Sequence, residues 1–508
     1  MPSRSPSHNL VPLDAGCPPE LYGRHELRDP RLARFAEVGT ARIGLLIPVL
    51  IVALAGQTAL LYLGALSVFG AEPSEPLVLF GQLLAIAATA VLLWRVVLVT
   101  RYRPTASVSD DELPSVTVIV PAYNEGAQVR SSLVSLMCSD YPRDKLQIIA
   151  IDDGSRDDTW SWMQRAAAQL GGQIELIRCP VNRGKRHALY EGFLRANGEV
   201  IVTVDSDSEV LSDTLRNLVS PLVVDARVGA VAGNVRVLNH DSGPIARMLE
   251  ISFTHAFEFM RASESEVAAV MCCPGALSAY RRALVDEFRD EWIAQTFLGE
   301  PAAIGEDRAM TNHVLRRGHH VRFQTNAIVL TEVPTTTGQL VRMLLRWARS
   351  NVRESLVMAS FAVRRFRSGS QVGPRLNLSL SLLATVVGGL AFVPTIVALV
   401  LAPALIAWVL LAGLIAALLP AAVFAMTRAQ RGASWAFPYA IYSLICLSWI
   451  GPFALISAHR SGWLTRQSLP AKPSSPAKHS LPATHTLPAE QPATKPPQIV
   501  SVAAKGWH

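Results

Sequence analysis

The chain of 508 residues is poor in cysteine and in charged side chains. Its six cysteines are scattered and contain no Cys-x-x-Cys pair, so we expect neither a disulfide scaffold nor a structural zinc site. Charged residues make up only 17%, against about 25% in typical soluble domains, whereas hydrophobic residues make up 50%. This balance argues against a wholly soluble chain and against a wholly disordered one.

Two common phosphate-binding motifs are also missing. No Gly-x-Gly-x-x-Gly follows the first predicted strand, and no Gly-x-x-x-x-Gly-Lys-Ser/Thr occurs. Their absence disfavours a nicotinamide or flavin dehydrogenase and a P-loop ATPase. A nucleotide would therefore have to bind through carboxylates and a metal ion. The net charge of +7 does not indicate nucleic acid, because excess Lys and Arg in a membrane protein usually marks its cytoplasmic flanks.

Long uncharged runs locate the membrane segments. Ile43–Ala71 and Leu77–Trp94 each suffice for one helix, because about 20 apolar residues cross a bilayer. The second span would continue to Val99 if the side chain of Arg95 reached the membrane surface. Leu376–Thr427 is long enough for two spans, and Gly432–Ala458 supplies another.

Arginine-rich flanks orient these spans. Arginines precede the first span, follow the second and precede the third, so the long segment between the second and third spans is expected in the cytoplasm. Five spans would put the C-terminus outside, whereas Arg460 and Arg466 favour the inside. The predicted organisation is a cytosolic arm (1–41), two spans (42–100), a cytosolic domain (101–337), amphipathic interface helices (338–375), about three spans (376–458) and a Pro-rich, disordered tail with a gating-like segment (459–508).

The cytosolic domain opens with alternating strand and helix patterns. Apolar runs at 116–120, 147–151, 174–178 and 200–204 predict four strands, and the stretches 127–138, 158–170 and 185–196 between them predict helices. Such alternation implies right-handed βαβ units and a parallel sheet, hence an α/β fold. Ligands of parallel sheets bind beyond the carboxyl ends of the strands, and the acidic clusters of this chain lie there.

Asp205 and Asp207 follow the fourth predicted strand directly. Two carboxylates at positions i and i+2 point the same way and reach one hard cation, so Mg²⁺ or Mn²⁺ bridging a diphosphate is one interpretation. An acidic turn that ends a strand is the plainer alternative. Asp152 and Asp153 end the second strand and are expected either to accept hydrogen bonds from a uracil or ribose, or to form an Asp-Asp-Gly turn.

Other candidates also have two interpretations each. Tyr123 stacks on a base or belongs to the core. Residues 182–185 place two cations before a helix, which suits a diphosphate or a solvated turn. Asp307 opens a helix beside Glu306, as a general base or as an ordinary acidic N-terminus. In the basic amphipathic stretch Gly338–Arg367, Arg346 and Trp347 either hold a phosphate and a sugar ring or anchor the helix at the membrane surface.

The ordered motifs resemble those of the processive family 2 glycosyltransferases, which include hyaluronan, chitin, cellulose and poly-N-acetylglucosamine synthases. The motifs are PAYNE (121–125), DDGS (152–155), DSD (205–207), GEDR (305–308) and RW (346–347). The segments 270–282, 305–323 and 346–355 look most like those of hyaluronan synthases and nodulation-type chitooligosaccharide synthases, and the last of them includes an Arg-Glu pair at 353–354. One departure is Met343, which stands where the family has the Gln of Gln-x-x-Arg-Trp.

The resemblance implies a GT-A-type α/β domain inserted between transmembrane helices, and a role for each matching residue. The implied reaction is inverting polymerisation of UDP-sugars, UDP-GlcNAc together with UDP-GlcA, into a hyaluronan-like polysaccharide that is secreted through the bilayer. A chitin-type or poly-N-acetylglucosamine synthase that uses UDP-GlcNAc alone is the alternative. The implied roles are donor binding by Tyr123, Glu125, Asp152, Asp153, Lys185, Asp205 and Arg346, binding of Mg²⁺ or Mn²⁺ by Asp205 and Asp207, general base by Asp307, acceptor binding by Gly275 and Trp347, and gating by Trp463 and Arg466.

Overall fold

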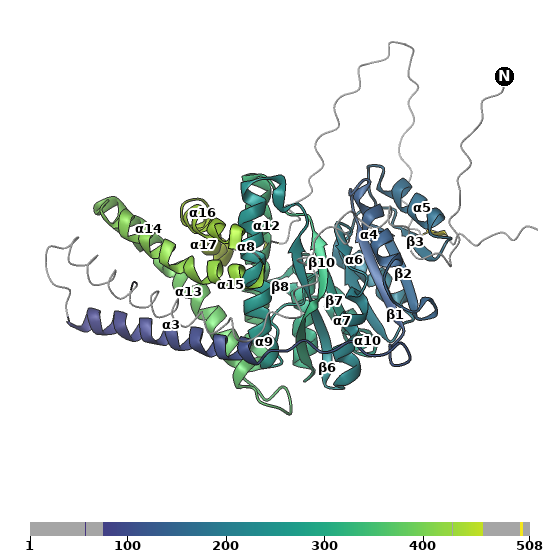
Figure 1. The fold of residues 1–508 in the computed structure, drawn as a ribbon, viewed down its shortest axis with the longest axis horizontal. Coiled ribbons are helices and arrows are strands. Elements are labelled where there is room, and N and C mark those ends of the chain that lie inside the picture. The colour runs from purple at the N-terminus through teal and green to yellow at the C-terminus, as the bar shows by residue number, and fades with distance from the viewer. Residues whose placement is uncertain (1–55, 57–74, 429, 461–497, 501–508) are drawn as a thin grey trace, which may run out of the picture.

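The computed structural model describes residue 56 and residues 75–428, 430–460 and 498–500. Its described part has a nine-stranded mixed sheet flanked by helices, and a group of long apolar helices to one side (Figure 1). The strand order is β11-β3-β2-β1-β4-β7-β6-β10-β5. The strands are β1 Val116–Ala122, β2 Leu146–Asp152, β3 Ile174–Arg178, β4 Val200–Val204, β5 Ser208–Val210, β6 Val228–Val237, β7 Leu277–Arg281, β10 His320–Thr331 and β11 Gln498–Val500, and β8 Thr296–Phe297 pairs separately with β9 Glu300–Pro301.

The helices fall into two groups. Those of the sheet region are α4 Gln128–Met137, α5 Thr159–Gln169, α6 Lys185–Arg195, α7 Thr214–Val224, α8 Pro244–Thr254, the π-helix η5 His255–Arg261, α9 Ala262–Glu266, α10 Arg282–Ile293, α11 Glu306–Arg316 and the short η3 Arg143–Lys145 and η4 His240–Ser242. Those of the apolar region are α3 Glu75–Arg101, α13 Val372–Leu401, α14 Leu405–Ala416, α15 Leu418–Thr427, η6 Gln430–Trp435, α16 Ala436–Tyr442, η7 Ser443–Leu447 and α17 Ile450–Ser457. Helix α12, Thr337–Ala362, stands between the two groups (Figure 1).

Strands β3, β2, β1 and β4 are parallel, as the sequence predicts. They are short runs rich in Val and Ile, and β1 and β4 are buried along their whole length, which is typical of parallel strands covered on both faces. Val116 of β1 lies opposite Leu146 of β2 and Val200 of β4, so the carboxyl ends of the three strands meet at one edge of the sheet. The predicted α/β fold is therefore confirmed. The acidic residues lie at the carboxyl ends of its parallel strands, where ligands of such sheets bind.

The apolar helices lie where the sequence has its uncharged runs. Among the described residues, α13 and the stretch Leu405–Thr427 are long and apolar enough to cross a membrane. The chain turns between them at Pro403. Residues Gly432–Leu447 and Ile450–Ser457, bent by 45°, add a third such segment if they count as one span. The predicted span Ile43–Ala71 lies outside the described residues, apart from position 56.

The side chain of Arg95 in α3 points into the protein. It is buried between three helices. Its Nη1 donates to Ser263 Oγ of α9 at 2.9 Å, and its Nη2 donates to Asn377 Oδ1 of α13 at 3.2 Å. A buried guanidinium needs such partners, because an unpaired charge in a dry interior is costly. Arg95 therefore links two apolar helices, α3 and α13, to the helix that precedes β7.

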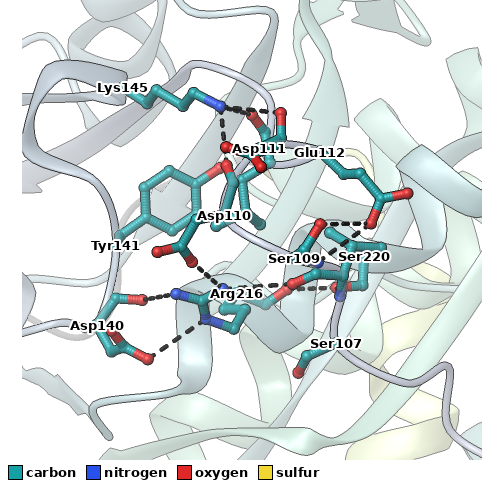
Figure 2. Close-up of polar contacts among 12 residues, drawn as sticks. Ser107, Ser109, Asp110, Asp111, Glu112, Asp140, Tyr141, Lys145, Arg216 and Ser220 are labelled. Atoms are coloured by element: carbon teal, nitrogen blue, oxygen red, sulfur yellow. Dashed lines mark hydrogen bonds and ion pairs between the residues drawn. The ribbon is translucent and has the colours of Figure 1, made fainter.

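The segment that leads from α3 to β1 is held to the sheet region by two basic side chains (Figure 2). Lys145 Nζ donates to the backbone carbonyls of Asp110, Asp111 and Leu113 at 2.9, 3.2 and 2.8 Å. Arg216 of α7 forms ion pairs with Asp110 at 2.6 Å and with Asp140 at 3.4 Å. These contacts fix the segment just before β1 against η3 and α7.

Candidate functional site

Polar side chains from three neighbouring strand ends meet at the carboxyl edge of the sheet. Glu125, just after β1, accepts a hydrogen bond on Oε1 from Ser206 Oγ, just after β4, at 2.8 Å. The backbone N–H of Asp153, just after β2, donates to the carbonyl of Ala122 at the end of β1 at 2.9 Å. Asn124 adopts a left-handed φ of 54°, which turns the chain back over this edge. The three acidic motifs are thus brought together by the register of β2, β1 and β4.

The Asp153 carboxylate connects this edge to the start of α6. Its two oxygens accept the backbone N–H groups of Arg183 at 3.0 Å and Gly184 at 2.8 Å. Burial raises the pKa of Asp153 to about 6, the two backbone hydrogen bonds oppose the shift, and the charge of Asp152 adds to it. Asp152 itself is fully buried and accepts the Ser155 N–H at 2.9 Å. Asp152 therefore stabilises its own turn, whereas Asp153 is poised to titrate near neutral pH.

Lys185, the first residue of α6, lies between two carboxylates. Its Nζ is 2.5 Å from Asp205 Oδ1 and 3.1 Å from Glu306 Oε1. Gly275 packs against the same ammonium group, since a Cβ at that position would lie 2.5 Å from Nζ. Residues from α6, from the end of β4, from the segment before β7 and from the start of α11 therefore converge at one point.

Asp307 adjoins this point from the first turn of α11. Its Oδ2 accepts the Gly275 N–H at 3.3 Å and faces the Cys272 thiol at 3.6 Å. Burial raises the pKa of Asp307, and the neighbouring charge of Glu306 adds to the shift, while Lys185 opposes it. Burial also acts upward on Glu306, but Lys185 and Arg346 outweigh it and lower that pKa to about 2. Adjacent carboxyl groups whose pKa values are pushed apart are typical of acid–base sites, and Asp307 is the more basic of the two.

Asp205 and Asp207 offer oxygen atoms to a hard cation. Asp205 faces Lys185, and Asp207 Oδ1 accepts hydrogen bonds from Ser208 Oγ at 3.2 Å and Thr331 Oγ1 at 3.4 Å. In the described part of the chain, no group of three or more His, Cys, Asp and Glu side chains could hold a metal ion. Two carboxylates suit Mg²⁺ or Mn²⁺, which are often held by one or two carboxylates while substrate phosphates and water supply the other ligands.

Helix α12 presents its predicted residues in three different environments. Arg346 is near enough to Glu306 to lower its pKa. Trp347 is 39% exposed, and its ring centre lies 6.1 Å from that of Phe253. Met343 is buried in the hydrophobic core. The helix thus faces the site with Arg346, keeps an indole partly open and uses Met343 for packing.

Residues 114–350 match the model of the glycosyltransferase-like family 2. An N-acetylglucosaminyltransferase of Rhizobium meliloti is 30% identical over 364 residues, which cover 71% of this chain and 83% of the relative. The chain belongs to glycosyltransferase family 2. A hyaluronan synthase of Streptococcus pyogenes is 31% identical over 249 residues, 48% of this chain and 58% of the relative. A solved mannosyltransferase of Pyrobaculum calidifontis, in complex with GDP-mannose and Mn²⁺, is 24% identical with a TM-score of 0.44, covering 71% of this chain and 97% of that one.

Membership of family 2 confirms three of the predictions made from the sequence: the family, the GT-A-type fold and the enzyme class. The specific residue roles stay predictions. The structure brings Lys185, Asp205, Gly275 and Asp307 of this glycosyltransferase together and sets Glu125 and Asp153 at the same sheet edge. Trp463 and Arg466, the predicted gating residues, lie outside the described residues.

Two contacts of the site were not assigned from the sequence of this glycosyltransferase. Glu306 is the second partner of Lys185, and Ser206 is the partner of Glu125. Both residues stand inside the acidic motifs, Glu306 beside Asp307 and Ser206 between Asp205 and Asp207. Their position inside these motifs was the only sequence signal for a role in the site. Their partners lie on α6 and just after β1, and only the fold brings those elements close to them.

Proposed function

We propose that the protein is a membrane-embedded, inverting glycosyltransferase that polymerises sugars from UDP-GlcNAc and UDP-GlcA into a β-linked, hyaluronan-like polysaccharide and secretes it. The observation that carries this proposal is the convergence of Lys185, Asp205, Gly275 and Asp307 at the edge of a family 2 sheet. A cation, a potential metal ligand and a raised-pKa carboxylate are the groups that transfer from a nucleotide diphosphate requires. The hyaluronan synthase relative supports the polymer.

A second candidate is a chitooligosaccharide or poly-N-acetylglucosamine synthase that uses UDP-GlcNAc alone. The N-acetylglucosaminyltransferase of Rhizobium meliloti supports it, with 30% identity over 364 residues. Both candidates share the donor UDP-GlcNAc and the same site residues. They differ only in whether a second nucleotide sugar is accepted, so the product separates them.

In this proposal the side chains of the sheet edge divide the work. Tyr123, Glu125 and Asp153 hold the uridine beside the turn that Asp152 stabilises, and Lys185 and Arg346 face the diphosphate. Asp205 and Asp207 would hold Mg²⁺ or Mn²⁺, and the bound ion would neutralise charge on the diphosphate leaving group. Asp307 takes the proton from the acceptor hydroxyl as that oxygen attacks the anomeric carbon from the face opposite the diphosphate, and a single base suffices because the configuration inverts. Gly275 and Trp347 support the acceptor sugar.

The apolar helices supply the route for the product. A polysaccharide is too polar to cross lipid unaided, so a path must be lined by protein groups that satisfy it. Of the helices apolar enough to cross a membrane, α13 packs directly against α12, which carries Arg346 and Trp347, and α17 packs against α12 as well. We propose a multi-pass protein of the cell membrane with its catalytic domain in the cytoplasm and its polymer exit through this helix group.

The proposal is tested by supplying the purified full-length protein in detergent or lipid with UDP-GlcNAc, UDP-GlcA or both, in the presence of Mg²⁺ or Mn²⁺. We expect polymer only when both donors are present, and we expect hyaluronidase to digest it. Polymer from UDP-GlcNAc alone that chitinase or a poly-N-acetylglucosamine hydrolase digests would favour the second candidate. No sugar transfer from either donor would contradict both. Removal of the metal with a chelator should stop transfer, and readdition should restore it.

Two single variants separate the metal role from the base role. Asp307→Asn keeps the shape of the side chain but cannot take a proton, so we expect UDP-GlcNAc binding within about twofold of wild type and a loss of transfer of roughly 100-fold or more. Asp207→Asn should instead raise the concentration of metal required for turnover. Titration calorimetry and a radioactive incorporation assay measure the two effects. Donor binding lost in Asp307→Asn would make Asp307 a binding residue.

A further inference from the structure

Behind the first turn of α11, a buried ion pair of α12 remains without a role in the reaction proposed above. Arg353 is 1% exposed and Glu354 is fully buried. Arg353 Nε donates to Glu354 Oε1 at 2.9 Å, and Arg353 Nη2 donates to the backbone carbonyl of Ile304. Ile304 lies three residues before Asp307, so the guanidinium is hydrogen-bonded to the turn that directly precedes the proposed base.

The Glu354 carboxylate accepts hydrogen bonds from two further parts of the chain. Glu354 Oε1 also accepts from Gln295 Nε2 at 3.1 Å, just beyond α10, and Oε2 accepts from Asn312 Nδ2 of α11 at 3.0 Å. Both oxygens are therefore satisfied in the protein interior. Buried ion pairs of this kind contribute little net stability, because desolvation of the two charges cancels much of their attraction. Their value lies in fixing one geometry, which points to a role in positioning rather than in folding.

The turn before α11 packs closely against α12. Gly305 has a left-handed φ of 73°, and the space where its Cβ would stand is taken by Ser350 Oγ and Arg353 Nη2. On the other side of Asp307, Arg308 Nη1 donates to Asn351 Oδ1 at 2.5 Å and Nη2 donates to Ser355 Oγ at 2.8 Å. The proposed base is thus held from both flanks by consecutive turns of α12.

A hydrogen-bonded chain also joins this pair to the donor side of the site. Gln295, which donates to Glu354, accepts from Arg186 Nη1 at 3.1 Å, and Arg186 follows Lys185 at the start of α6. Arg186 Nη1 donates to the Trp292 carbonyl at 2.8 Å, and Trp292 Nε1 donates to the Glu306 carbonyl at 3.0 Å. The start of α6 and the start of α11 are therefore tied to the same pair by buried polar contacts, over and above the direct contact of Lys185 with Glu306.

We propose that Arg353 and Glu354 are positioning residues that set the place of Asp307 relative to Lys185 and the bound donor. The inference rests on the function proposed above, because it assigns the pair to the transfer step of that reaction. Arg353 acts on Asp307 through the Ile304 carbonyl, and Glu354 acts through Asn312 of α11, so neither side chain has to touch the reacting atoms. An error of about 1 Å in the place of a reacting group costs as much as 100-fold in rate, so a small loosening of this turn has a measurable effect.

The test is Arg353→Lys, which keeps the positive charge but removes the planar guanidinium with its several donors. An ammonium group cannot donate to Ile304 and Glu354 in the planar geometry of the guanidinium. We expect kcat to fall between about 10-fold and 100-fold, with the KM for UDP-GlcNAc and the Kd for UDP within about twofold of wild type. We also expect more UDP to be released per sugar incorporated. A displaced base slows attack by the acceptor hydroxyl more than it slows attack by adventitious water, which hydrolyses the donor. Arg342→Lys, an exposed position on the same helix, is the matched control and should behave as wild type.

A second, milder variant covers the case in which Arg353→Lys fails to fold. Gln295→Met removes one donor from Glu354 at a half-buried position and should lower kcat about threefold, again with unchanged KM. An Arg353→Lys enzyme with wild-type kcat and a wild-type ratio of UDP released to sugar incorporated would overturn the inference. Parallel losses of donor affinity and kcat in a protein of normal thermal stability would overturn it as well. Wild-type protein that transfers nothing from the candidate donors would contradict the proposed function instead, so the two failures are told apart.

Discussion

Among single residues, Asp153 shows how the fold alters the chemistry of a side chain. The carboxyl group is 3% exposed, and its pKa rises to about 6 because burial outweighs the two backbone hydrogen bonds that it accepts. An ordinary aspartate has a pKa of about 4 and is fully ionised throughout the neutral range. Asp153 takes up a proton as the pH falls through about 6, so its charge at the proposed uridine site changes within a range that binding experiments reach easily.

We predict that UDP-GlcNAc binding weakens at acidic pH through Asp153. If the uridine binds the ionised carboxylate, affinity is full above pH 7 and declines as the pH falls through about 6, since protonation removes the acceptor. Between pH 7 and pH 5 the dissociation constant should rise about tenfold. Titration calorimetry measures it, and the donor is suitable because its diphosphate diester does not titrate in this range. Asp153→Asn should bind weakly with a flat pH profile, and an equally steep profile in that variant would refute the assignment.

At the scale of elements, the start of α11 depends on a residue without a side chain. Gly305 precedes the helix at φ 73° and packs against Ser350 and Arg353 of α12. A left-handed conformation costs an L-residue roughly 1–2 kcal/mol, and a Cβ here would in addition overlap the Ser350 hydroxyl. The contact between α11 and α12 is therefore as close as it is because position 305 is glycine, and this closeness lets Arg353 reach Ile304.

We predict that Gly305→Ala harms the enzyme more than strain alone would. Gly299, in the exposed turn between β8 and β9, has a similar φ of 86° but no atom within 4 Å of an added Cβ. Gly299→Ala should therefore lose about 1–2 kcal/mol of stability and keep its activity. Gly305→Ala should lose more stability and most of its transfer activity, because α11 must move away from α12. Denaturation and incorporation assays compare the two variants, and equal effects would contradict the steric argument.

At the scale of the whole molecule, the sheet region and the apolar helices are joined by buried polar contacts as well as by packing. Arg95 bonds α3 to α9 and α13, and Arg349 of α12 donates to Ser457 of α17 at 3.0 Å. Such contacts leave the two parts of the protein little freedom to move independently, since breaking one strands a buried charge. The sheet edge that we propose as the catalytic site is thus held at a defined place relative to the helices that we propose to cross the membrane.

We predict the side of the membrane on which each part lies. With the sheet region in the cytoplasm and α13 crossing the bilayer, the turn at 402–404 emerges outside. A cysteine placed at the exposed Asp241 should react with a membrane-impermeant maleimide only in inside-out vesicles, and one placed at the exposed Ala404 only in intact cells. The parent protein gives the background from its own cysteines. Labelling of both positions from the same side would contradict the topology.

Much of the fold was predictable from the sequence because local patterns specify local structure. The strands predicted at 116–120, 147–151, 174–178 and 200–204 begin and end in the structure within two residues of those bounds. Short runs rich in Val and Ile that end in polar turns have few alternative structures. The acidic motifs were recognised for the same reason, since parallel strands bring their carboxyl ends to one edge. Their order along the chain also led to the family.

Only the tertiary structure decided which of these side chains meet. Lys185, Gly275 and Glu306 are far apart in the sequence, and they come together because β7 inserts antiparallel beside β4 and α11 packs over that edge. The same holds for Arg95, because only the fold brings its partners in α9 and α13 to it. Hydropathy counts the residues along one helix, whereas burial and pKa depend on what other elements place around it. The sequence by itself therefore determined the elements and the family, and long-range packing decided the partners, the charges and the geometry of the site.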